Sequence, residues 1–170
     1  MKLWNTKIEH KADYPLKCGD NLLFSLLESR GINEKDYDEF LNPLDNKLQS
    51  PYVFSDMQKA KERIEKAIQN KELILIWGDF DADGVTSTSI LYKTFKTLDA
   101  NFDYIIPDRE KMGHGINTKF LLPYIAKNKP KVLITVDCGI SNAKEISLIK
   151  NFGIDVILTD HHKAPDVLPE

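Results

Sequence analysis

The stretch from residue 73 to 89 places the strongest constraint on how this chain can fold. Its first six residues, Leu-Ile-Leu-Ile-Trp-Gly, have the length and composition of a buried strand. Asp79, Asp81 and Asp83 follow directly, and then come Gly84 and a hydroxyl-rich segment that can begin a helix. Carboxylates this close together repel one another, so a bound cation or a solvated loop must relieve the repulsion. Which of the two does so decides what the protein does.

Strands and helices alternate from this stretch onward. We expect strands over residues 73–78, 102–106, 131–136 and 155–158, with helices over 85–98, 117–127 and 142–151 between them. This order predicts a doubly wound α/β fold, in which a mainly parallel sheet carries helices on both faces. Two short helices over 20–30 and 34–41, and a third after Ser55, precede it. We therefore predict a helical lead-in over 1–50 and the first part of an α/β domain over 51–170.

Composition limits the possible functions. The chain has 170 residues, enough for one core with a small appendage, and a net charge of −3. That charge offers no overall attraction for a polyanion, so binding to nucleic acid must depend on local cations or on a bound metal. Cys18 and Cys138 fit neither a disulfide nor a metal-ligand spacing, and residues 1–12 do not form a signal peptide. The cytoplasm is the expected location.

Three of the four expected strands end in possible metal ligands. Asp79, Asp81 and Asp83 follow the first strand, Asp137 follows the third, and Asp160, His161 and His162 follow the fourth. In open parallel sheets, ligands bind outside the carboxyl ends of the strands. A single acidic residue after a strand is commonly a helix cap. Three such strand ends together favour a shared cation.

A calcium loop and a nucleotide-binding loop are two rival motifs for the acidic stretch. A calcium loop that started at Asp79 would need Glu at its twelfth position, where Ile90 stands, and a helix before it, where a strand is expected. Neither glycine-rich nucleotide-binding pattern is present. Thr86 and Ser87, with the amides of the following helix, can hold a phosphate, although helix capping explains these hydroxyls equally well.

The type of metal follows from the ligand types. Carboxylates with one or two imidazoles and no thiolate cluster suit Mn²⁺ or Mg²⁺ better than structural zinc. Asp81, Asp83, Asp137 and His161 are enough for two ions that share a carboxylate. Ions about 3.5–4 Å apart are used in phosphoryl transfer, where they hold the attacking and leaving oxygens.

These residues resemble the motifs of the DHH phosphoesterase superfamily. Residues 78–87 are similar to its first motif, 160–162 to its namesake Asp-His-His motif, and 136–141 to the motif between them. Further short sequence segments resemble those of the family branch that degrades single-stranded DNA, at residues 29–32, 40–43, 56–60, 106–109 and 113–116. The resemblance therefore extends over essentially the whole chain.

The resemblance implies a two-metal phosphodiesterase that uses Mn²⁺ or Mg²⁺ and degrades single-stranded DNA in the 5′→3′ direction during recombination and repair. It implies metal ligands at Asp81, Asp83, Asp137 and His161, supporting carboxylates at Asp79 and Asp160, and His162 near the scissile phosphate. Substrate contacts are expected from Arg109, Thr86, Ser87 and His114, where the family usually has Tyr. Single-stranded DNA is the expected partner, with a single-strand-binding protein and a helicase as further partners and no membrane.

The resemblance also implies a longer enzyme. The family's further metal-binding Asp, its second core domain and its nucleic-acid-binding domain have no counterpart here, so we expect this chain to be inactive alone. Two alternatives remain open. One is a DHH-type phosphoesterase of small substrates, namely a pyrophosphatase, an oligoribonuclease or a cyclic-dinucleotide phosphodiesterase. The other is a non-catalytic replication scaffold. The lead-in over 20–41 and residues 107–109 favour the exonuclease, and the acidic cluster argues against a scaffold.

Overall fold

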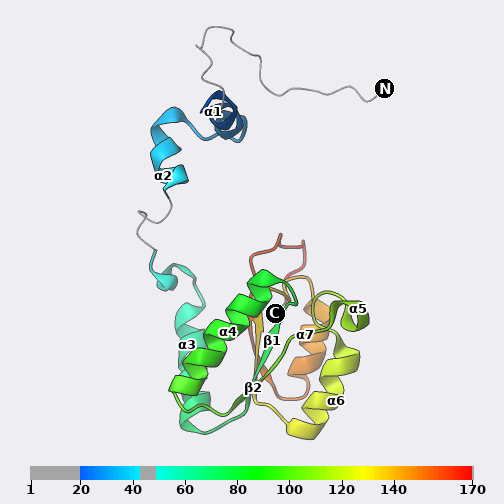
Figure 1. Ribbon diagram of the computed structural model, residues 1–170. Coiled ribbons are helices and arrows are strands. Elements are labelled where there is room, and N and C mark those ends of the chain that lie inside the picture. Colours follow the sequence, from blue (N-terminus) through cyan, green and yellow to red (C-terminus); the bar gives the residue numbers. More distant parts are fainter. Residues whose placement is uncertain (1–19, 43–48, 170) are drawn as a thin grey trace, which may run out of the picture. The chain divides into compact units, whose positions relative to one another are not determined.

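The computed structural model describes residues 20–42 and 49–169 (Figure 1). The chain divides into two units, Met1–Pro51 and Tyr52–Glu170. The expected lead-in segment over 1–17 and Cys18 lie outside the described residues. Among the helices that the structure describes, none is long and apolar enough to cross a membrane.

The first unit contains two short helical segments. Helix α1 (Asp20–Ser29) ends in a turn in which the Gly31 amide donates to the Glu28 carbonyl and the Ile32 amide donates to the Leu27 carbonyl. This arrangement needs the left-handed backbone of Gly31, whose φ is +79°. The second segment begins as a 3₁₀ turn, η1 (Glu34–Asp36), and continues as α2 (Tyr37–Leu41). Phe24 of α1 stacks on Tyr37 with ring centroids 4.9 Å apart, so the two segments pack together.

The second unit is built on a parallel sheet. Its strands are β1 (Ile74–Gly78), β2 (Phe102–Ile105), β3 (Val132–Val136) and β4 (Asp155–Thr159). The order across the sheet is β2-β1-β3-β4, and every pair is parallel. The predicted doubly wound α/β fold is confirmed, because helices follow each strand but the last and pack on both faces of the sheet (Figure 1).

Each face of the sheet has its own pair of long helices. Helices α3 (Met57–Gln69), which follows the 3₁₀ turn η3 (Pro51–Val53), and α4 (Ala82–Thr97) pack on one face. Helices α6 (Thr118–Asn128) and α7 (Ala143–Lys150) pack on the other. Strands β1 and β3 are buried along their whole length, which explains why their sequences are apolar except for Thr135 in β3.

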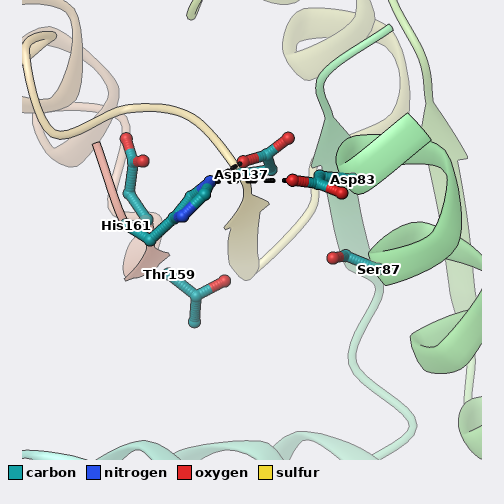
Figure 2. Close-up of a pocket in the computed structure, with 6 residues that line it drawn as sticks. Asp83, Ser87, Asp137, Thr159 and His161 are labelled. Carbon is teal, nitrogen blue, oxygen red and sulfur yellow. Dashed lines mark ion pairs between the residues drawn. The ribbon is translucent and has the colours of Figure 1, made fainter. Parts of the chain in front are cut away.

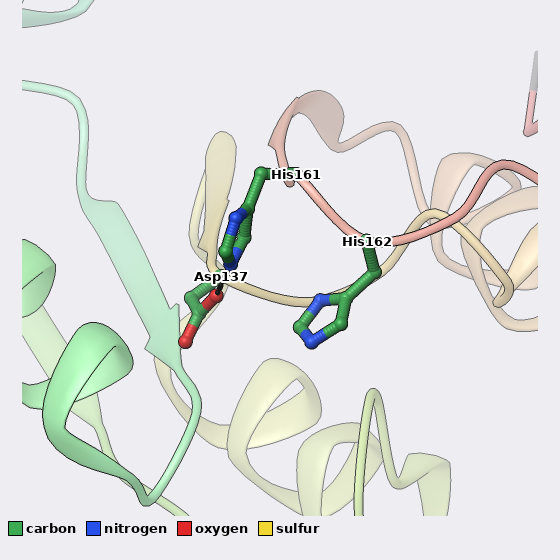
Figure 3. Close-up of side chains that lie close together, drawn as sticks. All are labelled: Asp137, His161 and His162. Carbon is green, nitrogen blue, oxygen red and sulfur yellow. Dashed lines mark ion pairs between the residues drawn. The ribbon is translucent and has the colours of Figure 1, made fainter. Parts of the chain in front are cut away.

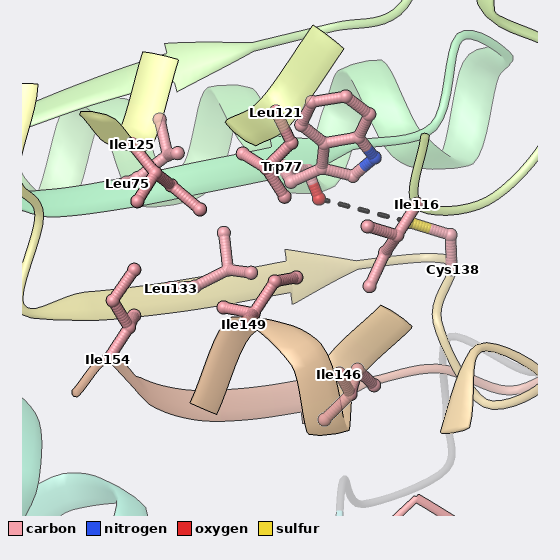
Figure 4. Close-up of a cluster of buried hydrophobic side chains, with 10 residues drawn as sticks. All are labelled: Leu75, Trp77, Ile116, Leu121, Ile125, Leu133, Cys138, Ile146, Ile149 and Ile154. Atoms are coloured by element: carbon pink, nitrogen blue, oxygen red, sulfur yellow. Dashed lines mark hydrogen bonds between the residues drawn. The ribbon is translucent and has the colours of Figure 1, made fainter. Parts of the chain in front are cut away.

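Alternate residues of the central strands supply the two cores. Leu75, Trp77 and Leu133 face α6 and α7, where Figure 4 shows them among isoleucine side chains from both helices. Ile76 and Ile134 face α3 and α4 on the opposite side. The Trp77 indole N–H donates to the Gly115 carbonyl over 3.1 Å, so this buried nitrogen is satisfied and the loop after α5 is fixed to the sheet.

The start of one helix and the presence of another differ from the sequence expectation by more than one residue. Helix α4 begins at Ala82 and not at residue 85, because the Asp81 carboxylate caps it and brings Asp83 and Gly84 into its first turn. A short helix, α5 (Arg109–Met112), was not expected. It forms because the Asp108 carboxylate accepts a hydrogen bond from the Glu110 amide over 3.0 Å. Both starts are therefore determined by an aspartate cap.

The buried position of Leu133 leads to a test of the core. Leu133→Ala should lower the free energy of unfolding by about 2–5 kcal/mol, because it leaves a cavity between β3 and α7. The control is Leu148→Ala on α7, where the side chain is 40% exposed and the loss should be under about 1 kcal/mol. Urea denaturation followed by circular dichroism measures both values. Equal losses would contradict this description of the core.

Candidate metal centre

The register of the sheet aligns three aspartates at its carboxyl edge. Gly78 pairs with Val136, and Val136 pairs with Thr159. Asp79, Asp137 and Asp160 each come one residue later, so they leave three neighbouring strands at the same height. The strand ends predicted from the sequence to carry ligands are therefore adjacent in space.

The first turn of α4 lies directly against the end of β1. A Cβ atom at Gly84 would overlap the backbone of Asp79, and one at Gly78 would overlap the Thr88 hydroxyl. Both glycines are therefore needed for this close approach. It places Asp81 beside the ends of β1 and β3.

Asp81 caps α4 with one oxygen. Its Oδ1 accepts hydrogen bonds from the amides of Asp83 and Gly84 over 3.0 and 3.1 Å. The Gly84 amide is the main reason that the pKa of Asp81 is lowered. The carboxylate is thus held ionised by the helix N-terminus, and Oδ2 is left for another partner.

Asp137 is the most constrained residue of the site. Its φ of +61° is left-handed, which is uncommon for a residue other than glycine. The residue is 7% exposed, and among the described residues no backbone amide donates a hydrogen bond to its carboxylate. Burial raises the pKa of Asp137, and the nearby Asp81 raises it further. Figure 3 shows the His161 ring pointing at Asp137, with Nε2 3.0 Å from Oδ1.

Asp160 is a fully satisfied carboxylate. Its Oδ2 accepts from the Ile140 amide over 2.9 Å, and its Oδ1 accepts from the His162 amide over 3.0 Å and lies 2.7 Å from His162 Nδ1. Burial alone would raise the pKa of Asp160, but these hydrogen bonds outweigh burial and lower it. The hydrogen bond to Asp160 in turn raises the pKa of His162. Asp160 therefore orients His162.

The predicted ligands come together in two groups that share Asp137. Asp79, Asp81 and Asp137 each offer a ligand atom, and these atoms lie within 4.8 Å of one another; the same holds for Asp137, His161 and His162. Asp83 is less close, with Oδ2 3.9 Å from His161 Nε2. The geometry thus places Asp79 and His162 as near to the centre as the expected ligands. The sequence had predicted only a supporting role for Asp79 and a catalytic role for His162.

A pocket of about 370 Å³ opens over these groups. Figure 2 shows Asp83 and Ser87 of α4 across the opening from Thr159 and His161 at the end of β4, with Asp137 between the two sides. Asp160 completes the lining. Thr159 was missed by the sequence reasoning; its position as the last residue of β4 was the available signal.

The expected substrate contacts other than Ser87 are not part of the pocket lining. The Thr86 hydroxyl donates to the Ala82 carbonyl over 2.8 Å, so it bonds back to its own helix. His114 packs on Phe80 with ring centroids 4.6 Å apart, and its Nδ1 lies 3.9 Å from Asp79 Oδ2. The Arg109 guanidinium lies 5.2 Å from the Phe80 ring centre. Phe80, which the sequence reasoning also missed, therefore links the Arg109 and His114 side chains to the site.

The donor set fits a hard divalent cation. Carboxylate oxygens and imidazole nitrogens are the ligands that suit Mn²⁺ and Mg²⁺. Burial raises the pKa of the Cys138 thiol to about 12, so a thiolate does not compete near neutral pH. Asp137 adds the decisive observation, because its enclosed carboxylate lies beside Asp81 and has no backbone donor among the described residues, so a cation would offset the cost of burying its charge.

Comparison with known proteins shows the family to which the chain belongs. Residues 73–170 match the DHH family, N-terminal domain, and the chain belongs to this family. It is 41% identical over 150 residues to the single-stranded-DNA-specific exonuclease RecJ of Bacillus subtilis (strain 168), covering 88% of this chain and 19% of the relative.

Two solved structures extend the comparison. A crystal structure of exonuclease RecJ bound to manganese matches with a TM-score of 0.61 and 33% identity, over 66% of this chain and 29% of that one. The structure of RecJ in complex with Mn²⁺ from Thermus thermophilus matches with a TM-score of 0.62 and 29% identity, over 84% of this chain and 19% of that one. The chain thus spans less than a third of each of these relatives.

The Asp160–His162 pair leads to a test by titration. In the metal-free protein, the pKa of His162 should lie above its ordinary value of 6.5, and Asp160→Asn should lower it. The pKa of His162 is higher in the folded state than its ordinary value of 6.5. The Asp160–His162 pair therefore stabilises the protein at pH values below 6.5, and this stabilisation is lost as the pH rises through the folded-state pKa of His162. Imidazole NMR signals in the presence of EDTA measure the pKa. Asp99→Asn, a remote surface substitution, should leave the pKa unchanged, and an unmoved pKa in Asp160→Asn would disprove the pairing.

Proposed function

We propose that this chain is the metal-binding N-terminal part of an exonuclease that hydrolyses single-stranded DNA from its 5′ end and depends on a divalent metal ion. One observation carries the proposal: Asp137 is enclosed, receives no backbone hydrogen bond among the described residues, and belongs to both groups of ligand atoms. A carboxylate in that position is suited to bridge two cations. The relatives named above are exonucleases specific for single-stranded DNA, and two of their structures contain manganese.

Each residue near the pocket has a proposed role. Asp81, Asp83, Asp137 and His161 hold Mn²⁺ or Mg²⁺, and Asp79 supports them from the end of β1. The bound ions supply an activated water as the nucleophile and neutralise charge on the phosphate. Asp160 holds His162 through Nδ1, which leaves Nε2 to donate a proton to a phosphate oxygen. Ser87, on the wall of the pocket, contacts the substrate phosphate.

The rim supplies the positive charge that the site itself lacks. Arg109 and His114 both pack on Phe80, which lies between Asp79 and Asp81 in the sequence. A phosphate next to the one being cleaved would meet the Arg109 guanidinium and the His114 imidazole, and both pack on Phe80. Thr86 is a weaker candidate, because its hydroxyl is already used within α4.

The wider context of the site is also proposed. Residues 1–50 form a helical lead-in and residues 51–170 the first part of the DHH domain. The chain works in the cytoplasm, in DNA recombination and repair, with a single-strand-binding protein and a helicase as partners. The small-substrate phosphoesterases and the replication scaffold are not favoured, because the named relatives act on single-stranded DNA.

Metal binding can be tested on this chain directly. With EDTA, Asp137→Asn should raise the free energy of unfolding by about 0.5–2 kcal/mol, because it removes a buried charge next to Asp81. Calorimetric titration with Mn²⁺ should then show binding to the wild-type chain and an affinity at least about tenfold lower for the variant. Asp99→Asn is the matched control, since it removes an exposed charge outside the site. Unchanged Mn²⁺ affinity in Asp137→Asn would rule out this metal centre.

Activity can be tested in a chimera. The matching segment of the Bacillus subtilis relative is replaced by this chain, and degradation of 5′-labelled single-stranded DNA is followed with Mn²⁺. We expect the chimera to degrade the strand and its Asp137→Asn form to be at least about a hundredfold slower, since one shared ligand is lost. The isolated 170-residue chain should show little or no activity. A chimera that hydrolyses pyrophosphate but not DNA would support the small-substrate alternative.

A further inference from the structure

The loop that carries His114 is held at a single peptide group. The carbonyl of Gly115 accepts a hydrogen bond from the Trp77 indole over 3.1 Å. The amide of Ile116 donates to Asn142 Oδ1, also over 3.1 Å. Both groups belong to the peptide that joins residues 115 and 116, and in a trans peptide they point in opposite directions. The plane of this peptide is therefore fixed from two sides, by β1 and by the residue before α7.

Asn142 is a helix cap whose side chain does not cap its own helix. It occupies the N-cap position of α7, yet within the described part of the chain its side chain accepts no hydrogen bond from that helix. The cap residues of α4, α5 and α6, namely Asp81, Asp108 and Asn117, each accept from an amide in the first turn of their helix. A capping side chain normally stabilises its helix. In α7 this contact is absent, and the side chain holds the loop instead.

An asparagine suits both neighbours of position 142. The Ile116 amide can only donate a hydrogen bond, whereas the Glu145 carboxylate, to which Asn142 Nδ2 donates over 3.2 Å, can only accept one. A side-chain amide satisfies both partners at once. Aspartate at this position would repel Glu145, and alanine would reach neither partner.

Gly115 allows the close contact between the loop and Asn142. Its φ is +74°, in the left-handed region, and a Cβ atom here would lie 2.5 Å from Asn142 Oδ1. Glycine is therefore needed both for the backbone conformation and for the close approach. Ile116 is 4% exposed and belongs to the core shown in Figure 4. His114 is thus only two residues away from a buried anchor.

The fixed peptide determines where the His114 side chain lies. This side chain is 69% exposed, but its ring centroid is 4.6 Å from that of Phe80, and its Nδ1 is 3.9 Å from Asp79 Oδ2. Gly113, with φ +71°, precedes it. An exposed side chain on a loop with glycine on both sides samples many conformations unless its backbone is held. The hydrogen bonds to the peptide between residues 115 and 116 supply that restraint.

We propose that Asn142 is a positioning residue that holds the His114 imidazole over Phe80, beside the metal centre. The inference rests on the proposed function, in which His114 meets the phosphate next to the one being cleaved. Asn142 acts through the loop peptide and not on the reacting atoms. Its loss should therefore weaken substrate binding, which raises KM, and leave kcat nearly unchanged.

The turn before α7 is held independently of the Asn142 side chain. The Ile140 amide donates to Asp160 Oδ2 over 2.9 Å, and the Asn142 amide donates to the Gly139 carbonyl over 2.9 Å. Both donors are backbone groups, so Asn142→Ala keeps them. The pairing of Asp160 with His162 should then be unaffected, and the His162 signals provide an internal reference.

The first test uses NMR of the metal-free 170-residue chain. In Asn142→Ala, the Ile116 amide should exchange with solvent at least about tenfold faster, because its acceptor is lost. The His114 ring signals should also lose the shift that the Phe80 ring causes, while the His162 signals stay in place. Asn128→Ala is the matched control, since the Asn128 side chain donates to the Tyr124 carbonyl over 3.1 Å, away from the loop.

The second test repairs the contact in the chimera with the Bacillus subtilis relative. Asn142→Ala should raise KM for single-stranded DNA at least about fivefold and change kcat less than about twofold. Asn142→Asp combined with Glu145→Gln keeps the acceptor for the Ile116 amide and reverses the hydrogen bond between the two side chains, so it should restore KM. In a chimera that already carries His114→Ala, Asn142→Ala should have no further effect on KM.

Several results would overturn the proposal. Unchanged Ile116 exchange or unmoved His114 signals in Asn142→Ala would show that Asn142 does not hold the loop. A KM that the double variant does not restore, or that rises further in the His114→Ala chimera, would show that Asn142 acts other than through His114. An inactive chimera with the expected NMR changes would contradict the proposed function and still confirm that Asn142 places His114.

Discussion

Electrostatic repulsion between carboxylates at one edge of a parallel sheet is the constraint on which this structure depends. Parallel strands end side by side, so the register that aligns Gly78, Val136 and Thr159 also gathers Asp79, Asp137 and Asp160. Asp81 and Asp83 at the start of α4 add further negative charge. Such a cluster is stable only if each carboxylate is solvated, hydrogen-bonded or met by a cation.

The fold supplies backbone donors to three of these five carboxylates. Asp81 accepts from two amides of α4, Asp160 accepts from Ile140 and His162, and Asp79 accepts from the Phe80 amide over 2.7 Å. Asp83 is exposed to solvent, whereas Asp137 is buried in a left-handed backbone and receives no backbone hydrogen bond within the described residues. Asp137 is therefore the carboxylate that most needs a ligand. Backbone strain and a buried charge without a backbone donor are expected at a functional site.

The sequence was sufficient to predict the architecture, because β1 and β3 are mainly apolar segments and the strands alternate with clear helical patterns. It was also sufficient to gather the acidic residues, since parallel strands bring their carboxyl ends together. The sequence did not show that Asp79 and His162, and not Asp83, would be grouped closely with Asp137. That ranking depends on how closely α4 approaches β1, and this distance is set by Gly78 and Gly84 against Thr88 and Asp79. The capped helix α5 was missed because it is only four residues long and has no repeating apolar pattern.

The charged side chains that add up to the net charge of −3 are unevenly distributed along the direction of the strands. The carboxyl edge of the sheet carries the aspartates, whereas the amino edge carries Lys129 and Lys131, with Arg63 occupied by two acidic partners. A polyanionic substrate is repelled by the first edge until cations are bound there, so metal occupancy and substrate capture are linked by the same carboxylates. The two edges of the sheet therefore differ in local charge, and only the carboxyl edge gathers possible metal ligands among the described residues.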